Sequence, residues 1–366
     1  MENFEIAVLP GDGIGVEVTH SALTVLEAVS KKTGLRFVPQ YLRAGAIAYQ
    51  ETGTALSDET IAAAGAADAI LLGAMGLPHI RYVDGTEISP QLDLREHFEL
   101  YAGVRPIRPL PGLPLKLSDP RAADIDFVLV REQTEGLFFE RGNTRMTGDE
   151  EARDALVITR KGAQRVFDFA FRLGAQRKAQ GRPGRVTCVD KANVLGAMAY
   201  FRRIFEERAT AHPDITADSA YVDAMALNLV MKPWDYDVLV TENLLGDILS
   251  DLSAALVGGM GMAPSADIGE GHALFQPAHG SAPDIAGRGI ANPTAMLLSV
   301  VMMLDWLAER RAEARLADAA RMLEHVIERA YAARQILPYE FGGRSGTADI
   351  TRAVLADITR AVLAGI

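Results

Sequence analysis

Cysteine is almost absent from this 366-residue chain, whose single cysteine is Cys188. One cysteine forms no internal disulfide, and a chain of this length can bury a core large enough to need none. The composition therefore fits a reducing compartment, and the cytoplasm is the expected location. Cys188 stands in the β-rich run RVTCVDKAN, so we expect it to pack in the core rather than to react.

The sequence also lacks an excess of basic residues and any long apolar run. Its formal net charge is −11, so it offers no broad cationic surface for nucleic acid or an anionic membrane. The N-terminus, MENFEIAVLPGDG, has no signal-peptide pattern. The run PTAMLLSVVMMLDWLAE is too short to span a bilayer and ends in charges. These absences argue against nucleic acid and membranes as binding partners.

Strand and helix patterns alternate along the chain, which is typical of an α/β fold. FEIAVL, DAILLGA, DIDFVLVRE, GRVTCVDKAN and YDVLVTENL are predicted strands, and several of them end in polar residues. Helices are predicted over residues 16–32, over ITRKGAQRVFDFAFRLGAQRK and GDILSDLSAAL, and over residues 291 to about 334. The Pro-rich segment RPIRPLPGLPLKLSDPRAAD is expected to be irregular. Length and pattern suit two domains or one large α/β unit.

The glycine-rich turn GDGIGVE, residues 11–17, stands between a predicted strand and a predicted helix. Dinucleotide-binding folds place a phosphate loop at such a point, but Val16 occupies the third glycine position of that pattern. No acidic residue follows a second strand either, where the sequence reads KKTGLRF. A tight turn with another role in the site is therefore preferred over an ordinary phosphate loop.

Two carboxylates stand four positions apart in ENLLGDILSDLS, at Asp247 and Asp251. A helix places both on one face, where they repel each other unless a cation lies between them. The residues around them are apolar, which disfavours a solvated helix face. Carboxylate oxygens suit Mg²⁺ or Mn²⁺, so the pair is a candidate site for a divalent metal.

Three arginines, Arg95, Arg105 and Arg131, stand at or near the ends of apolar segments. Taken singly, each is more often a surface charge. The planar guanidinium group is nevertheless suited to gripping carboxylates. If the three converge, the target is a substrate with several carboxylates.

Two further segments are candidates for chemistry. VDKAN places Lys191 and Asn193 at a predicted strand end, where a lysine whose pKa is lowered by burial can act as a base; an ordinary exposed lysine is the alternative. Residues 276–293, QPAHGSAPDIAGRGIANP, combine Gly, Ser and Pro with His, Asp and Asn before a predicted helix. This composition is typical of a shaped loop that holds a cofactor.

Seven motifs occur in a fixed order: AVLPGDGIGVEV, LREHFELYAGVRP, VREQTEG, VDKANVL, YVDAMALNLV, GDILSDL and HGSAPDIAGRGIANPTA. Together they resemble the β-decarboxylating dehydrogenases, which act on isocitrate, isopropylmalate and tartrate or malate. VDKANVL and YVDAMAL are most similar to the isopropylmalate branch, whereas AADIDFVLVREQTEG is closer to the tartrate/D-malate branch. The resemblance runs from about Ala7 to Ala295, nearly the whole chain.

The resemblance implies an α/β fold of the isocitrate/isopropylmalate dehydrogenase type, with two α/β domains sharing a central cleft, and not a standard Rossmann fold. Residues 1–102 together with 258–366 would form a cofactor-binding domain. Residues 103–257 would form the domain for substrate, metal and dimerisation. The family also implies a homodimer with shared active sites, which Lys191 and Asp223 reach from the neighbouring subunit.

The resemblance further implies a role for individual residues. Arg95, Arg105 and Arg131 would bind the malate carboxylates of a polycarboxylate substrate, and Lys191 would take the proton of the C2 hydroxyl. Asp223, Asp247 and Asp251 would surround Mg²⁺ or Mn²⁺. Further substrate contacts are implied for Gln91, Leu92, Asn193 and Val194. The cofactor would contact Ile14, His279, Gly280, Ser281, Ala282, Asp284, Ile285 and Asn292. Asp284 suits a free ribose 2′-hydroxyl and would repel a 2′-phosphate, so NAD is favoured over NADP.

The chain departs from the family pattern at the proton donor and at the substrate wall. Phe138 stands where the family has a catalytic Tyr, and it carries no hydroxyl to donate a proton. Gln91 replaces one of the two adjacent leucines of isopropylmalate enzymes, which puts an amide where an isopropyl group needs an apolar wall. Val194 matches the isopropylmalate pattern, whereas Gln276 stands where Glu is common.

The leading hypothesis is an NAD- and metal-dependent oxidative decarboxylation of a 3-substituted malate to a 2-keto acid. Two alternatives stay open. One is a tartrate/D-malate or isocitrate/homoisocitrate type of dehydrogenase with weakened decarboxylation. The other is a poorly catalytic regulatory homologue, which Phe138 motivates and the intact Lys191 and aspartates disfavour.

Overall fold

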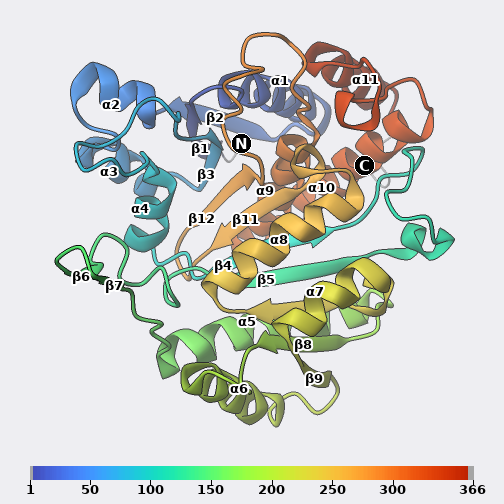
Figure 1. Cartoon of the computed structure of the whole chain (residues 1–366). Coiled ribbons are helices and arrows are strands. Elements are labelled where there is room, and N and C mark those ends of the chain that lie inside the picture. Colours follow the sequence, from blue (N-terminus) through green and yellow to red (C-terminus); the bar gives the residue numbers. More distant parts are fainter. Residues whose placement is uncertain (1–2, 362–366) are drawn as a thin grey trace.

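A computed structural model describes residues 3–361, whose centre is a single ten-stranded sheet (Figure 1). In sheet order the strands are β2 (Arg36–Tyr41), β1 (Asn3–Gly11), β3 (Ala69–Ala74), β12 (Ala273–Pro277), β11 (Pro264–Ile268), β4 (Ala102–Ile107), β5 (Phe127–Glu132), β10 (Val238–Thr241), β8 (Arg185–Asp190) and β9 (Thr216–Tyr221). A separate hairpin pairs β6 (Arg145–Thr147) with β7 (Glu151–Arg153). The predicted α/β class is confirmed.

The middle of the sheet is antiparallel and both flanks are parallel. Strand β11 is antiparallel to both β12 and β4, and β4 is antiparallel to β5. The other neighbouring strands are parallel. A standard Rossmann sheet is parallel throughout, so the expectation of a different fold is confirmed.

One face of the sheet carries a continuous layer of helices. These are α1 (Gly15–Thr33), α5 (Arg160–Ala179), α6 (Gly196–Ala209), α9 (Thr294–Arg311), α10 (Ala314–Ala332) and α11 (Thr347–Arg360). Their buried side chains form one hydrophobic core with strands from both flanks, including Val8, Val130 and Val240. This core ties the two flanks of the sheet together.

The opposite face carries two separate groups of helices. Helices α3 (Asp58–Ala66) and α4 (Pro90–His97) pack through Ala64 and Leu94 on the β1–β3 flank. Helices α7 (Val222–Met231) and α8 (Asn243–Val257) pack on the other flank, where Figure 1 shows them side by side. The short helix α2 (Ala46–Thr52) joins a satellite cluster with Leu77 and Ile80. The antiparallel strands lie between α4 and α8.

Local predictions were mostly confirmed. The predicted strands appear as β1, β3, β5, β8 and β10, and Cys188 is fully buried. The helical stretch 291–334 is divided at Ala312, which ends α9 with a φ of 50°. The Pro-rich segment was expected to be irregular, which is wrong at its start, because Arg105 lies within β4. Among residues 3–361 the structure has no helix long and apolar enough to cross a membrane.

Candidate active site

The three predicted arginines converge on one cavity of about 290 Å³ in the region between α4 and α8. Arg95 comes from α4, Arg105 from β4 and Arg131 from the end of β5, and all three are buried. The structure thus brings the three arginines to one cavity, which is the condition set out for a substrate with several carboxylates. Burial lowers the pKa of Arg131 to about 10 and also lowers that of Arg105, and Arg95 adds to both effects. Mutually repelling, partly dehydrated cations are stabilised by an anion, so this wall of the cavity is suited to carboxylates.

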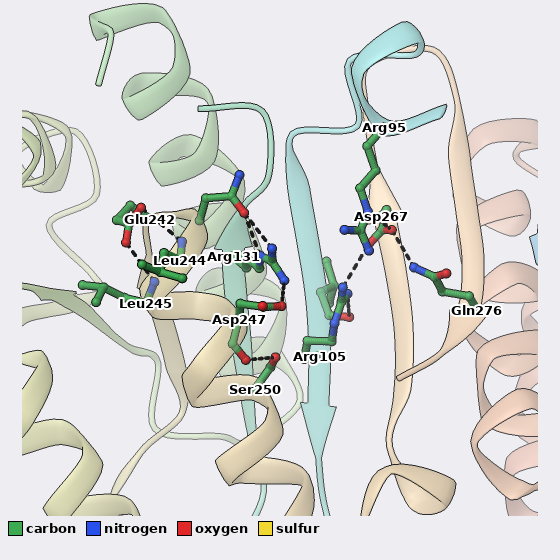
Figure 2. Close-up of polar contacts among 12 residues, drawn as sticks. Arg95, Arg105, Arg131, Glu242, Leu244, Leu245, Asp247, Ser250, Asp267 and Gln276 are labelled. Atoms are coloured by element: carbon green, nitrogen blue, oxygen red, sulfur yellow. Dashed lines mark hydrogen bonds and ion pairs between the residues drawn. The ribbon is translucent and has the colours of Figure 1, made fainter. Parts of the chain in front are cut away.

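Arg131 is held in place by α8. Its Nε and Nη2 donate to Oδ1 of Asn243 at 3.0 and 2.7 Å, and its Nη1 forms an ion pair with Asp247 (Figure 2). Asn243 in turn donates to the carbonyl oxygen of Glu135 at 2.8 Å. Glu242 accepts from the backbone amides of Leu244 and Leu245 and so caps α8. Sequence patterns did not reveal Asn243, because its partners lie more than a hundred positions away.

Asp247 and Asp251 both line the cavity, as their spacing on a helix predicted. Burial raises the pKa of Asp251, and the neighbouring Asp247 raises it further. A carboxylate pair that repels in this way is stabilised by a bound cation. Two oxygen-bearing side chains from one helix thus form part of a site for a hard divalent ion.

The cavity wall also includes the residues that mark the departures from the family pattern. Phe138 lies with its ring centre 5.4 Å from the guanidinium carbon of Arg131. Gln91 and Leu92 line the same cavity, and Oε1 of Gln91 is buried without a hydrogen-bond partner among the described residues. No tyrosine of the described chain lines this cavity. Tyr82, which precedes the arginine motifs in the sequence, does not line the cavity either.

Lys191 and Asp223 form an ion pair with each other, away from the arginine cavity. Lys191 follows β8 and Asp223 lies in the first turn of α7. The hydrogen bond from Lys191 lowers the pKa of the Asp223 carboxyl. Asn193 and Val194 are exposed beside them and do not line the cavity either. One chain therefore does not bring these four predicted residues to the arginines.

The predicted cofactor loop lies against the glycine-rich turn. The amide of Ile14 donates to the carbonyl oxygen of Ser281 at 2.8 Å, and Oγ of Ser281 donates to the carbonyl oxygen of Gly76. His279 and Gly280 line the arginine cavity. Burial lowers the pKa of His279, and its Nε2 has no hydrogen-bond partner among the described residues. The start of the loop is thus placed beside the substrate cavity.

The remainder of the loop leads away from the cavity. Ala282 has a φ of 36°, Asp284 is exposed and Ile285 is half-buried. Asn292 is buried, and its Nδ2 donates to Glu340 at 3.3 Å. These residues offer a polar edge at Asp284 and an amide at Asn292, groups that can contact a ribose and a heterocyclic base.

Two polar residues at the back of the site were not predicted to act in it. Asp267 on β11 is fully buried and forms salt bridges with Arg95 and Arg105. Gln276 on β12, noted only for its departure from Glu, donates to Asp267 at 2.9 Å. The signal in the sequence was an isolated acidic residue in the apolar run APSADIG, because a buried carboxylate requires a cationic partner.

The sequence of the chain matches a known family. A family profile described as isocitrate/isopropylmalate dehydrogenase matches residues 5–354. The chain belongs to this family, and it is a β-decarboxylating dehydrogenase. The family resemblance inferred from the seven motifs is therefore confirmed.

Individual relatives narrow the comparison. A 3-isopropylmalate/3-methylmalate dehydrogenase of Methanocaldococcus jannaschii is 43% identical over 351 residues, which cover 96% of this chain and 97% of the relative. A 3-isopropylmalate dehydrogenase of Thermotoga maritima is 42% identical, covering 91% of this chain and 93% of the relative. The crystal structure of isocitrate dehydrogenase from Methylococcus capsulatus is similar with a TM-score of 0.85 and 38% identity, covering 97% and 99% of the two chains. This likeness in structure confirms the expected fold.

Proposed function

We propose that this protein catalyses the NAD-dependent oxidative decarboxylation of a 3-alkyl-substituted malate to a 2-keto acid. The observation that carries the proposal is the convergence of Arg95, Arg105 and Arg131 with Asp247 and Asp251 on one cavity. Three guanidinium groups suit the two carboxylates of a malate. The relatives named for 3-isopropylmalate support the alkyl substituent.

The donor set fits a divalent cation when two chains are combined. Among residues 3–361, no group of three His, Cys, Asp or Glu side chains is placed to hold a metal. Asp247 and Asp251 provide one half of a site, and Asp223 of a second copy would complete it. A Mg²⁺ or Mn²⁺ ion bound there would polarise the oxygen at C2 of the substrate.

The residues of the chain then divide the chemistry. The arginines bind the two carboxylates and fix the orientation of C2 and C3. Lys191 of a second copy would accept the proton of the C2 hydroxyl, and a bound NAD⁺ would supply the acceptor for the hydride from C2. Asp284 would accept a hydrogen bond from a ribose 2′-hydroxyl and would repel a 2′-phosphate, which supports NAD over NADP. Among residues 3–361, no tyrosine lines the cavity to protonate C3.

An exposed apolar surface on α7 and α8 supports a homodimer with shared active sites. Leu227 and Met231 on α7 are 63% and 64% exposed, and Ile248 on α8 is 59% exposed. Val194, close to Lys191 in the sequence, is 67% exposed. Large apolar side chains gathered in this way are typical of an interface, and a two-fold axis would place each chain's lysine at the other chain's arginines.

The sheet order supports the proposed division into two domains. Strands β1, β3, β12 and β11 come from residues 1–102 and 258–366 and lie together. Strands β5, β10, β8 and β9 come from residues 103–257 and form the other flank. We assign cofactor binding to the first part, and substrate, metal and dimer contacts to the second.

A substrate panel tests the activity. NADH formation is measured with 3-isopropylmalate, D-malate, tartrate, isocitrate and homoisocitrate in the presence of Mg²⁺ or Mn²⁺, with NAD and with NADP. We expect turnover with a 3-alkyl malate and NAD. Failure of every substrate with metal present would refute the proposal.

A mixing experiment tests the shared site. The Lys191→Ala and Asp247→Asn variants should each be inactive as homodimers. Subunits exchanged by mild denaturation and refolding should regain roughly a quarter of the wild-type activity, because half of the dimers become mixed and each carries one intact site. A mixture as inactive as its parents would show that each chain builds its own site.

A further inference from the structure

The arginine wall of the cavity has a buried carboxylate behind it. Oδ2 of Asp267 accepts from Nε of Arg95 at 2.8 Å, and Oδ1 accepts from Nη2 of Arg105 at 3.1 Å (Figure 2). Nε2 of Gln276 donates to Oδ2 at 2.9 Å. The three donors come from α4, β4 and β12, so one side chain on β11 connects three other elements.

Asp267 is not part of the cavity wall, whereas the three side chains that it holds are. Its side chain is fully buried, and its register partner across the sheet is Gly103 of β4. Both carboxylate oxygens are used by donors, and Nη1 of Arg105 also donates to the carbonyl oxygens of Val104 and Ala266 at 3.2 Å each. A guanidinium group is planar, so fixing one edge fixes the direction of the others.

We propose that Asp267 is a positioning residue, which orients Arg95 and Arg105 for the substrate carboxylates without touching the substrate. The inference rests on the proposed function, because it assigns a task within the same site. Two effects compete when the charge of Asp267 is removed. The cavity becomes more cationic, which attracts an anion, but two buried guanidinium groups lose their common anchor and repel each other. An orienting role predicts that the second effect prevails.

Gln276 offers a way to separate charge from position. Its Nε2 lies 2.9 Å from Asp267, so a glutamate at 276 facing an asparagine at 267 would return one carboxylate to the same cluster. In the double variant the carboxylate and the amide exchange places. The cluster thus regains one negative charge, and the amide faces the new carboxylate. A residue that merely fills space would gain nothing from this exchange.

The test compares Asp267→Asn, Gln276→Glu and the double variant. The readouts are KM and kcat for the best substrate of the panel and the Kd of D-malate by calorimetry. For Asp267→Asn we expect KM and Kd to rise about 10- to 100-fold, the range for lost hydrogen bonds to charged groups, with a smaller fall in kcat. Gln276→Glu alone should also weaken binding, because it sets two carboxylates side by side. The double variant should return to within about fivefold of wild type, since contacting sites are not additive.

Asp237→Asn is the matched control. Asp237 is also fully buried and holds Arg177 and the amide of Gly184, but it lies outside the cavity. This variant should lose stability in thermal unfolding and keep KM and Kd. An unchanged or lowered KM and Kd in Asp267→Asn, or a double variant no better than Asp267→Asn, would overturn the positioning role. If wild type turns over no substrate, the proposed function fails instead, and the calorimetric comparison still tests Asp267.

Discussion

Phe138→Tyr adds the hydroxyl that the family resemblance implies as a proton donor at this position. Phe138 lines the cavity with the three arginines, and its ring lies 5.4 Å from the guanidinium carbon of Arg131. The side chain is half-buried and borders open cavity, so an added oxygen needs no repacking of the core. We expect a change in unfolding free energy of less than about 0.5 kcal/mol. The variant therefore tests chemistry rather than folding.

The size of the effect follows from the role of the missing group. General acid catalysis by a positioned side chain contributes about 10²- to 10⁴-fold to a rate. If loss of CO₂ from the oxidised substrate limits the wild type because this hydroxyl is missing, CO₂ release should rise by about 100-fold or more in Phe138→Tyr, up to the rate of hydride transfer. NADH formation should rise less, because Lys191 and the arginines already serve the oxidation step.

The assay measures NADH and CO₂ in the same reaction. Wild type should yield less CO₂ than NADH at early times, and Phe138→Tyr should yield equal amounts. Phe139→Tyr is the control, since Phe139 is 53% exposed and does not line the cavity that holds all three arginines, although it borders a second cavity with Arg95 and Arg131. Equal yields of CO₂ and NADH in wild type, with no gain in the variant, would show that another donor replaces the tyrosine.

Three further predictions concern substrate choice, pH and the backbone. Gln91→Leu should lower the KM for 3-isopropylmalate about 10-fold and leave that for D-malate unchanged, because it replaces an unpartnered amide with an apolar wall; equal changes for both substrates would contradict this reasoning. Burial raises the pKa of Asp267, but Arg95 and Arg105 lower it below its ordinary value of 3.8. As the pH falls, the unfolded chain therefore takes up this proton before the folded chain does. Below about pH 4, wild type should lose stability more steeply than Asp267→Asn, measured by urea unfolding at pH 5 and pH 3. Parallel losses would show that the ion pairs of Asp267 add nothing to stability. Gly11→Ala should lower the unfolding free energy by about 3 kcal/mol or more, because φ is 71° and a Cβ would lie 1.8 Å from the carbonyl oxygen of Ala74. Gly34→Ala, with a φ of 72° in open space, should lose only about 1 kcal/mol, and equal losses would exclude the clash as the cause.

The sequence predicted those features that follow from local spacing. Asp247 and Asp251 are one helical turn apart, so their common face could be read from the chain. The arginines carry their chemistry in their side chain, and family motifs indicated that they meet. Asp267 could not be found in this way, because it bonds to Arg95 across 172 positions. Likewise, the pairing of β4 with β11 joins distant segments, and no periodicity encodes which strands become neighbours.

The unequal covering of the two sheet faces has a mechanical consequence. The ten strands are hydrogen-bonded without interruption, and the helices of one face share a single core. The two flanks are therefore not joined by a flexible linker. The distance between α4 and α8 governs how closely Arg95 and Arg131 can approach one molecule, and it depends on the twist of β11, β4 and β5, which lie between the two flanks of the sheet. The width of the site thus depends on how easily these three strands deform. Core residues under the continuous helix layer, far from the substrate, contribute to that stiffness.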